Sequence, residues 1–300
     1  MRILIVGCGY VGTEVVRIAP SNWTFSALTR STARVAELHR LGVQPIVADW
    51  LEVDGSDLAT AVGPSSAGLV PPPPTTETAN PRFDVVLCLV PQRPTASLGA
   101  QTHAVALTRL AAALAPNRPR FLYLSTTGVY GSAVQGEVTE ETPVAPERES
   151  ARVAWAAEQW IAQHGADTSV IVRSAGIYGP GRLPLLAALQ RGEPLPVEPN
   201  ARINLVHVHD LARALMLLIE RPPRHRRYVL ADGQAVLRSE FYRYLADLYH
   251  LSPPAFAPPS LPSRRGSSDR SISPRRFVDE FGFEFVYPDY RHGLSARGRR

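Results

Sequence analysis

The chain has 300 residues, 45% of them hydrophobic and 20% charged, which excludes disorder of the whole chain and allows about two domains with buried cores. No run of about 18 apolar residues occurs, so no membrane span is predicted. The opening MRILIVG holds too few apolar residues for a signal peptide, and Cys8 and Cys88 form no CxxC motif. We therefore expect a cytoplasmic protein without a disulfide framework or a zinc site.

All 32 basic residues are arginines, and the chain contains no lysine. Arginine keeps its proton at working pH, whereas lysine can act as a base or form a Schiff base. The composition therefore excludes pyridoxal phosphate enzymes, P-loop phosphate binding and every proton transfer that a lysine would assist. The arginines are scattered and 27 acidic residues partly offset them, so we expect no binding to nucleic acid.

Short apolar runs alternate with helical patterns along the first half of the chain. Candidate strands cover residues 3–6, 24–28, 45–48, 84–90, 120–125 and 168–173. Amphipathic helices are predicted over residues 107–114, 153–161, 210–220 and 238–249. This alternation predicts an α/β fold, a doubly wound parallel sheet of the Rossmann type with a smaller C-terminal substrate domain.

We expect residues 1–175 to form a dinucleotide-binding domain and residues 176–300 to form mainly the substrate domain, with 203–221 returning to the first domain. Two segments are rich in proline: 63–81, with four consecutive prolines, and 252–271. Because proline fixes φ and lacks a backbone donor, neither segment should form sheet or helix. The chain ends on a basic stretch, SARGRR, which is predicted to be a solvated tail.

A GxGxxG motif follows directly after the first predicted strand and opens a helix. Gly7 permits the tight turn, Gly9 lets the backbone approach a pyrophosphate, and Gly12 lets the helix pack closely on the strand. The free N–H groups at the helix start, at Tyr10 and Val11, would receive the phosphates. In this context the motif predicts a dinucleotide site, and a glycine turn without a ligand is the alternative.

The end of the second strand indicates which dinucleotide is preferred. NAD-binding proteins carry an Asp or Glu here that accepts hydrogen bonds from the ribose, whereas this strand ends in ALTR with no acid nearby. Arg30 instead offers a forked cation to a 2′-phosphate, and Arg34, one helical turn further on, could assist. NADP is therefore favoured as the cofactor and NAD is the alternative, unless Arg30 is merely a solvated loop residue.

At this point the chain resembles the extended short-chain dehydrogenase/reductase superfamily, within its NAD-dependent epimerase/dehydratase family. Six strings carry the resemblance, and they follow the family's order over nearly the whole chain. They are GCGYVG at 7–12, ALTR ending at Arg30, AD at 48–49, LSTTGVYG at 124–131, RSAGIYGPGR at 173–182 and NLVHVHDLA at 204–212. Six ordered motifs are much more specific than a single glycine loop.

The resemblance implies roles for several residues outside the glycine loop. It places Asp49 at the adenine of the cofactor, with Leu89 and Ser125 as further cofactor contacts at strand ends. It makes Thr126 the hydroxyl that assists catalysis, because this residue matches the family's Ser/Thr position. The ligand would lie at the carboxyl ends of the strands.

The resemblance also implies residues for the substrate. Arg182 and Arg202 fall where family members often bind phosphates, although surface salt bridges would explain them equally well. Tyr178 and Tyr130 both follow strands, so each could line the substrate pocket. Either tyrosine could also replace a missing acid, which is the less favoured of the two roles.

The chain departs from the family at its usual catalytic pair. Members place a Tyr and a Lys four residues apart on the helix that ends in Ala-Glu, and counting back from Glu158 gives Ser150 and Ala154 at these positions. Neither can deliver a proton in the usual way. Arg152 is a candidate to occupy part of the vacated space. The chain therefore resembles the atypical branch of the superfamily, which keeps the fold and the glycine loop without this pair.

A pair of histidines is the remaining candidate for chemistry. His207 and His209 are predicted to alternate on a strand and to share one face, as the first two ligands of a metal site would. No third ligand pattern appears, so no metal is expected. Asp210 is predicted to cap the N-terminus of the helix that follows.

We therefore expect an NADP-binding reductase, epimerase or dehydratase that acts on a small or nucleotide-sugar substrate, with a homodimer as a candidate assembly. A cleft with two arginines favours an enzyme. The alternative is a non-catalytic NADP-binding redox sensor or regulatory protein, which the absent Tyr and Lys favour. Cofactor turnover separates the two.

Overall fold

The computed structural model describes residues 1–59, 82–257 and 269–295, so the proline-rich insertion 63–81 and the last five residues of the basic tail lie outside the described residues. The chain divides into two compact units, which we call unit 1 and unit 2. Unit 1 comprises Met1–Ser125, Arg152–Ile171 and Leu215–Arg226, and unit 2 comprises Thr126–Ala151, Val172–Ala214 and Arg227–Arg300. In the described part of the chain, none of the helices has the length and apolar character needed to cross a membrane.

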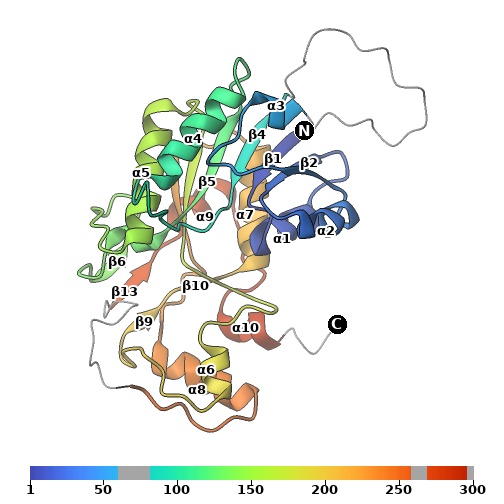
Figure 1. Ribbon diagram of the computed structural model, residues 1–300. Coiled ribbons are helices and arrows are strands. Elements are labelled where there is room, and N and C mark those ends of the chain that lie inside the picture. Colours follow the sequence, from blue (N-terminus) through green and yellow to red (C-terminus); the bar gives the residue numbers. More distant parts are fainter. Residues whose placement is uncertain (60–81, 258–268, 296–300) are drawn as a thin grey trace. The chain divides into compact units, whose positions relative to one another are not determined.

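Seven strands form one sheet in the order β11-β7-β5-β4-β1-β2-β3 (Figure 1). They are β1 (Arg2–Val6), β2 (Thr24–Thr29), β3 (Val43–Val47), β4 (Val85–Cys88), β5 (Arg120–Thr126), β7 (Val170–Ser174) and β11 (Arg227–Leu230). β1 pairs in parallel with β2 and β4, and the pairs β2–β3 and β4–β5 are parallel too. This confirms the predicted α/β fold with a doubly wound sheet, in which β1 lies between β4 and β2 and carries the glycine motif at its carboxyl end.

The helices that follow these strands have apolar faces. They are α1 (Tyr10–Ile18), α2 (Val35–Arg40), α3 (Gly55–Ala59), α4 (Thr102–Ala113), α5 (Glu149–His164) and α7 (Val208–Glu220), with a short 3₁₀ helix η1 (Thr32–Arg34) before α2. Leu107 and Leu110 of α4 and Ile161 of α5 are fully buried in one cluster with the strand residues Leu4 and Val86. Residues on both faces of the central strands are buried, which explains why these strands are continuous apolar runs.

Unit 2 holds the smaller elements. Its strands are β6 (Gly136–Val138), β8 (Gly176–Tyr178), β9 (Arg202–Ile203), β10 (Leu205–His207), β12 (Val236–Leu237) and β13 (Arg270–Ile272), and its helices are η2 (Thr127–Tyr130), α6 (Leu186–Gln190), α8 (Arg238–Leu248), α9 (Arg275–Phe281) and α10 (Tyr290–Ser295). They form three two-stranded sheets, β10–β8, β12–β9 and β13–β6. A cluster that includes Leu195, Phe241, Leu245 and Leu294 forms the core of this unit.

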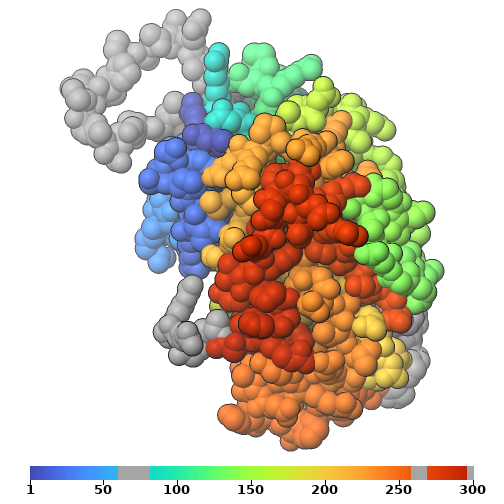
Figure 2. Space-filling model, turned by 180° about the vertical axis from the view of Figure 1, so that it is seen from behind, coloured from blue at the N-terminus to red at the C-terminus, as the bar shows by residue number. Residues whose placement is uncertain are grey.

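The C-terminal segment, drawn in red in Figure 2, is tied to unit 2 by buried groups. The ring of Phe277 is fully buried and lies edge-on to Tyr228 at a centroid distance of 5.6 Å. The carboxylate of Asp210 accepts hydrogen bonds from the backbone N–H groups of Val286 at 2.9 Å and Tyr287 at 2.8 Å. The expectation that Asp210 caps its own helix is therefore wrong: it lies inside α7 and binds the C-terminal segment instead.

Two further expectations are corrected by the local structure. His207 ends β10, whereas His209 lies in the first turn of α7, so the two histidines do not alternate on one strand. The segment 252–271 was expected to be free of sheet, but Arg270 and Ser271 belong to β13, which pairs in parallel with β6. The prolines of this segment end before these two residues, so the backbone donors that a strand needs are present there.

Candidate functional site

The glycine loop of unit 1 has the shape that a dinucleotide site requires. Gly7 has a φ of +89°, and a Cβ there would lie 3.1 Å from the backbone nitrogen of Val90. A Cβ on Gly12 would lie 3.3 Å from Sγ of Cys8. A Cβ on Gly9 would meet nothing within 4 Å, so the backbone at Gly9 faces open space. The positive φ and the close backbone at Gly7 therefore require glycine, and Gly12 is closely packed, whereas an absent side chain at Gly9 leaves room for a ligand.

The start of α1 presents backbone N–H groups beside this open space. Gly9 is the N-cap residue, and within the described part of the chain no side chain caps the helix or adds an acid to its first turn. Val11 is buried and Tyr10 is half-buried, so the first turn is fixed in place. Backbone N–H groups with the positive end of the helix dipole favour a phosphate, so the residues present fit the pyrophosphate of a dinucleotide.

Arg30 lies at the end of β2, with its side chain 74% exposed. Its Nη1 is 3.7 Å from Oδ2 of Asp49, whose other oxygen accepts a hydrogen bond from the N–H of Leu51 at 3.0 Å. An exposed ion pair of this kind contributes little to stability. The structure therefore brings the predicted 2′-phosphate residue and the predicted adenine residue together, with the guanidinium open to solvent.

Arg34, the second cation predicted for this site, contacts the glycine loop. Its Nη2 donates a 2.8 Å hydrogen bond to the carbonyl oxygen of Cys8 inside the glycine loop. Its Nε also forms a 3.0 Å ion pair with Glu37. Arg34 thus supports the loop that would hold the phosphates.

The two remaining cofactor candidates sit at strand ends. Leu89 follows β4, donates from its N–H to the carbonyl oxygen of Val6 at 2.9 Å, and would lie 3.4 Å from a Cβ on Gly12. The hydroxyl of Ser125 donates a 2.5 Å hydrogen bond to Oε1 of Glu158. Both of these side chains are buried, Ser125 at 3% exposure and Glu158 at 1%. Ser125 therefore has a structural partner of its own.

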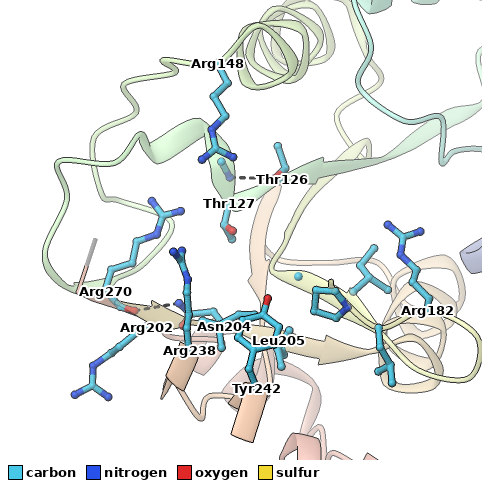
Figure 3. A pocket seen from close by; sticks show the side chains of 16 residues that line it. Thr126, Thr127, Arg148, Arg182, Arg202, Asn204, Leu205, Arg238, Tyr242 and Arg270 are labelled. Carbon is cyan, nitrogen blue, oxygen red and sulfur yellow. Dashed lines mark hydrogen bonds between the residues drawn. The ribbon is translucent and has the colours of Figure 1, made fainter. Parts of the chain in front are cut away.

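Unit 2 contains a cavity of about 410 Å³ whose charged lining is entirely basic (Figure 3). Five arginines contribute to it, and none of its 16 lining residues, all of them described, is acidic: the arginines are Arg148, Arg182, Arg202, Arg238 and Arg270. Thr126, Thr127 and Asn204 add uncharged polar groups. A pocket of this composition suits phosphate or carboxylate oxygens.

The predicted catalytic hydroxyl lines this pocket. Thr126 ends β5, and its Oγ1 accepts a 3.0 Å hydrogen bond from the N–H of Gly128, which makes it the cap of η2. Because the oxygen serves as the acceptor, the hydroxyl proton can be donated to a substrate oxygen. Thr126, which the family resemblance predicts to assist catalysis, therefore lines a pocket and also caps η2.

The arginines of the pocket are held by several segments. Arg202 forms a 2.6 Å ion pair with Asp269 and donates to the carbonyl oxygen of Ala235 at 3.0 Å. Arg270 donates from Nη1 to the carbonyl oxygen of Gly131 at 2.6 Å. Burial and the neighbouring charge of Arg148 lower the pKa of the Arg270 guanidinium.

The two candidate tyrosines do not line the pocket and are fully buried. The hydroxyl of Tyr130 donates to the carbonyl oxygen of Thr139 at 2.7 Å and accepts from Nη1 of Arg173 at 2.9 Å. The hydroxyl of Tyr178 donates to the carbonyl oxygen of Asp289 at 3.0 Å, and burial raises its pKa. These contacts give both tyrosines structural roles.

Ser150 and Ala154 stand at the positions of the family's usual Tyr and Lys. Ser150 lies in the first turn of α5 and is exposed, whereas Ala154, one turn on, is fully buried. Arg152 is exposed and is not among the lining residues of the pocket. The arginine that does reach the pocket from this region is Arg148, which directly precedes α5.

Sequence reasoning identified Thr126, Arg182 and Arg202, and the structure brings all three to one pocket. It missed three other arginines, Arg148, Arg238 and Arg270. Each stands in a stretch that carries other arginines or acids, so no local pattern separates it from a solvated side chain. The one available signal was the absence of lysine together with a basic net charge.

Three comparisons with known proteins agree with this arrangement. Residues 85–231 match the NAD dependent epimerase/dehydratase family. Protein YeeZ from Escherichia coli (strain K12) is 37% identical over 177 residues, which cover 59% of this chain and 62% of that protein, so less than two thirds of that relative is matched.

Two solved structures match over nearly their whole length. A conserved, functionally unknown protein from Silicibacter pomeroyi DSS is 25% identical with a TM-score of 0.74, and the match covers 98% of this chain and 97% of that one. UDP-glucuronic acid 4-epimerase from Bacillus cereus, in complex with UDP-glucuronic acid and NAD, has a TM-score of 0.76 at 16% identity, covering 99% and 97%, which is a likeness of fold. The glycine loop and the sheet order agree with these matches, in which the model of the NAD-dependent epimerase/dehydratase family covers residues 85–231.

Proposed function

We propose that the chain is an NADP-dependent member of this family that converts a small anionic substrate, with a nucleotide sugar as the leading candidate. The observation that carries the proposal is the pocket that places the Thr126 hydroxyl among five arginines and no acid. Guanidinium forks suit phosphate and carboxylate oxygens better than they suit neutral ligands. The fold neighbour from Bacillus cereus binds UDP-glucuronic acid and NAD, which supports the choice of substrate class.

The preference for NADP rests on Arg30. Its exposed guanidinium stands at the strand end where an NAD-binding protein would carry an acid, and its present partner, Asp49, is 3.7 Å away. A 2′-phosphate could therefore bind Arg30 without breaking a strong contact. Gly7, Gly9 and the start of α1 would hold the pyrophosphate, and hydride transfer is the chemistry that a nicotinamide supplies when bound.

In the pocket, the chain's own residues would bind and orient the substrate. Thr126 would donate its hydroxyl proton to a substrate carbonyl or hydroxyl oxygen, while the arginines offset the substrate's charge. Ser150 is exposed and Ala154 has no polar side-chain atom, so neither supplies a proton in the way the family's usual pair does.

The second candidate function is an NADP-binding sensor without turnover. Two observations favour it: Ala154 is fully buried where a lysine would be needed, and the hydroxyls of Tyr130 and Tyr178 are engaged in buried hydrogen bonds. A sensor would bind the reduced and oxidised cofactors with different affinities and convert no substrate.

Incubation of the full chain with NADP⁺ or NADPH and with UDP-glucose or UDP-glucuronic acid tests the two functions. Nicotinamide absorbance reports net redox change, and chromatography of the sugar nucleotides reports epimerisation or dehydration without net change. The enzyme function predicts a cofactor-dependent product whose formation Thr126→Val slows. Tight NADPH binding with no product from any of these mixtures would support the sensor instead.

A further inference from the structure

Three arginines meet at one part of the pocket, beside Thr126 and Thr127. Figure 3 shows the guanidinium groups of Arg148, Arg238 and Arg270 turned toward this part, while Arg182 lies on the other side. Arg148 directly precedes α5, Arg238 opens α8 and Arg270 opens β13. Three separate segments therefore deliver cations to the same place.

None of the 16 lining residues of the pocket, all of them described, is acidic. Arg270 donates to a neutral acceptor, the carbonyl oxygen of Gly131, and among the described residues no carboxylate oxygen lies within 4.0 Å of its guanidinium. Arg202 differs, because Asp269 neutralises it at 2.6 Å. Burial, and after it the neighbouring charge of Arg148, lowers the pKa of the Arg270 guanidinium, while Tyr130 and Glu147 oppose the shift.

One of the three arginines, Arg238, is buried in the wall of the pocket. Arg238 is only 7% exposed, and moving a guanidinium out of water is costly unless the site compensates it. The neighbouring residue Tyr242, also a lining residue, is fully buried on the same helix. The cations are thus part of a formed cavity wall.

We propose that Arg148, Arg238 and Arg270 form a subsite for an oxyanion group of the substrate, a carboxylate or a phosphate, next to the Thr126 hydroxyl. The inference deepens the proposed function and rests on it, because it assigns a negative charge to the part of the substrate that approaches Thr126. Arg182 lies on the other side of the pocket, where it would face a second anionic group. A substrate that used both sides would carry two separated negative charges.

Calorimetric titration of the full chain with inorganic phosphate and with malonate, at constant ionic strength, tests the subsite. Saturating NADPH is present, so that the glycine loop offers no second phosphate site. We expect at least one of the two anions to bind in preference to chloride, phosphate being the tighter ligand if the substrate group is a phosphate and malonate if it is a carboxylate. Arg148→Gln and Arg270→Gln should each weaken this binding by about 10-fold or more.

Arg275→Gln is the matched control. Arg275 lies on α9 of the same unit, outside the pocket lining, and its side chain is 84% exposed. Its loss removes one positive charge without touching the subsite, so the affinity should stay within about two-fold of the unmodified chain. Equal losses in Arg275→Gln and Arg148→Gln, or no binding of either anion beyond that of chloride, would overturn the inference.

The same proteins separate this inference from the proposed function. Arg148 is exposed, so Arg148→Gln is expected to fold, and NADPH affinity measured on each variant reports the state of the glycine loop. If NADPH binds normally but no anion binding depends on the arginines, the subsite is contradicted and the proposed function is not. If NADPH does not bind, the titration is repeated on the free chain: an anion site that depends on Arg148 then supports the subsite while the proposed function fails.

Discussion

Nη2 of Arg34 donates a 2.8 Å hydrogen bond to the carbonyl oxygen of Cys8, which joins the start of α2 to the glycine loop after β1. Arg30, four residues earlier, makes no such bond and faces Asp49 at 3.7 Å. Two arginines that look equivalent in the sequence therefore have different expected effects. Under the proposed function, Arg34 would shape the loop for any dinucleotide, and Arg30 would distinguish one dinucleotide from another.

Arg34→Ala should weaken NADPH and NADH binding by a similar factor. The substitution removes a hydrogen bond from a charged donor, worth about 1.5 kcal/mol, and lets the Cys8 carbonyl move. Fluorescence titration with both nucleotides measures the two affinities. Arg17→Ala is the control, since Arg17 is 62% exposed on α1 and pairs only loosely with Glu14 at 3.9 Å. A selective loss of NADPH binding would show that Arg34 contacts the 2′-phosphate instead.

Gly7→Ala and Gly9→Ala should have opposite effects. At Gly7 the φ of +89° and the 3.1 Å approach to the backbone of Val90 should cost about 1–3 kcal/mol of stability. At Gly9 no atom lies within 4 Å of the added Cβ, so stability should fall less than at Gly7 while nucleotide affinity falls. Thermal unfolding and NADPH titration of both variants check this, and a stable Gly9→Ala protein with unchanged affinity would contradict the loop's assigned role.

Ser125→Ala should reduce stability and leave cofactor affinity nearly unchanged. The substitution removes the 2.5 Å hydrogen bond to Glu158, whose carboxyl group is 1% exposed, and loss of such a buried partner costs about 1–3 kcal/mol. Ser132→Ala provides a comparison, because Ser132 makes a similar bond to Glu147 in an exposed position. Urea unfolding measures both free energies of unfolding; similar small effects would mean that the buried pair contributes no more than a surface one.

Thr126→Val should lower turnover by roughly 10-fold or more, whereas Ser150→Ala should leave it unchanged. Thr126 lines the pocket, and Ser150 is an exposed residue of the first turn of α5. Because Thr126 also caps η2, its loss costs about 1 kcal/mol of stability, and Thr126→Ser should restore both properties. Initial rates with saturating substrate measure the turnover of each variant. The reverse ranking would indicate that Ser150 is an activated group.

The free energy of unfolding should fall as the pH rises through neutrality. Burial raises the pKa of Asp232 to about 7, with a further contribution from Asp289 and Asp210, while a hydrogen bond from the N–H of Gln234 opposes the shift. A raised carboxyl pKa in the folded state means that the stabilisation is complete below the unfolded pKa of about 3.9 and is lost as the pH passes about 7. Urea unfolding at about pH 4 and at about pH 8 should show a loss on the order of a few kcal/mol between the two.

Asp232→Asn should flatten this pH dependence, since the amide oxygen can still accept from Gln234 and no proton is bound. The control is Asp279→Asn, because Asp279 is 68% exposed on α9. A dependence that persists in Asp232→Asn would assign it to another group.

The sheet and the glycine loop could be predicted because their signals are local. Buried parallel strands must be continuous apolar runs, and the turn at Gly7 admits only glycine, so both leave a mark within a few residues. Thr126 was found for the same reason, as it directly ends a strand.

The pocket could not be predicted in full because it is assembled from distant segments. Arg148, Arg238 and Arg270 are brought together only by the pairing of β13 with β6 and by the packing of α8. Tyr178 was expected to contact substrate because it follows a strand, but the C-terminal segment supplies an acceptor at Asp289 that no local pattern indicates.

The cofactor preference tests the account most directly. Fluorescence titration of the full chain with NADPH and NADH at equal ionic strength compares the two affinities, and Arg30→Ala provides the internal reference. We predict that NADPH binds more tightly than NADH by about 1.5–3 kcal/mol and that Arg30→Ala removes this difference without changing the affinity for NADH. Equal affinities in the unmodified chain, or a preference that survives Arg30→Ala, would contradict it.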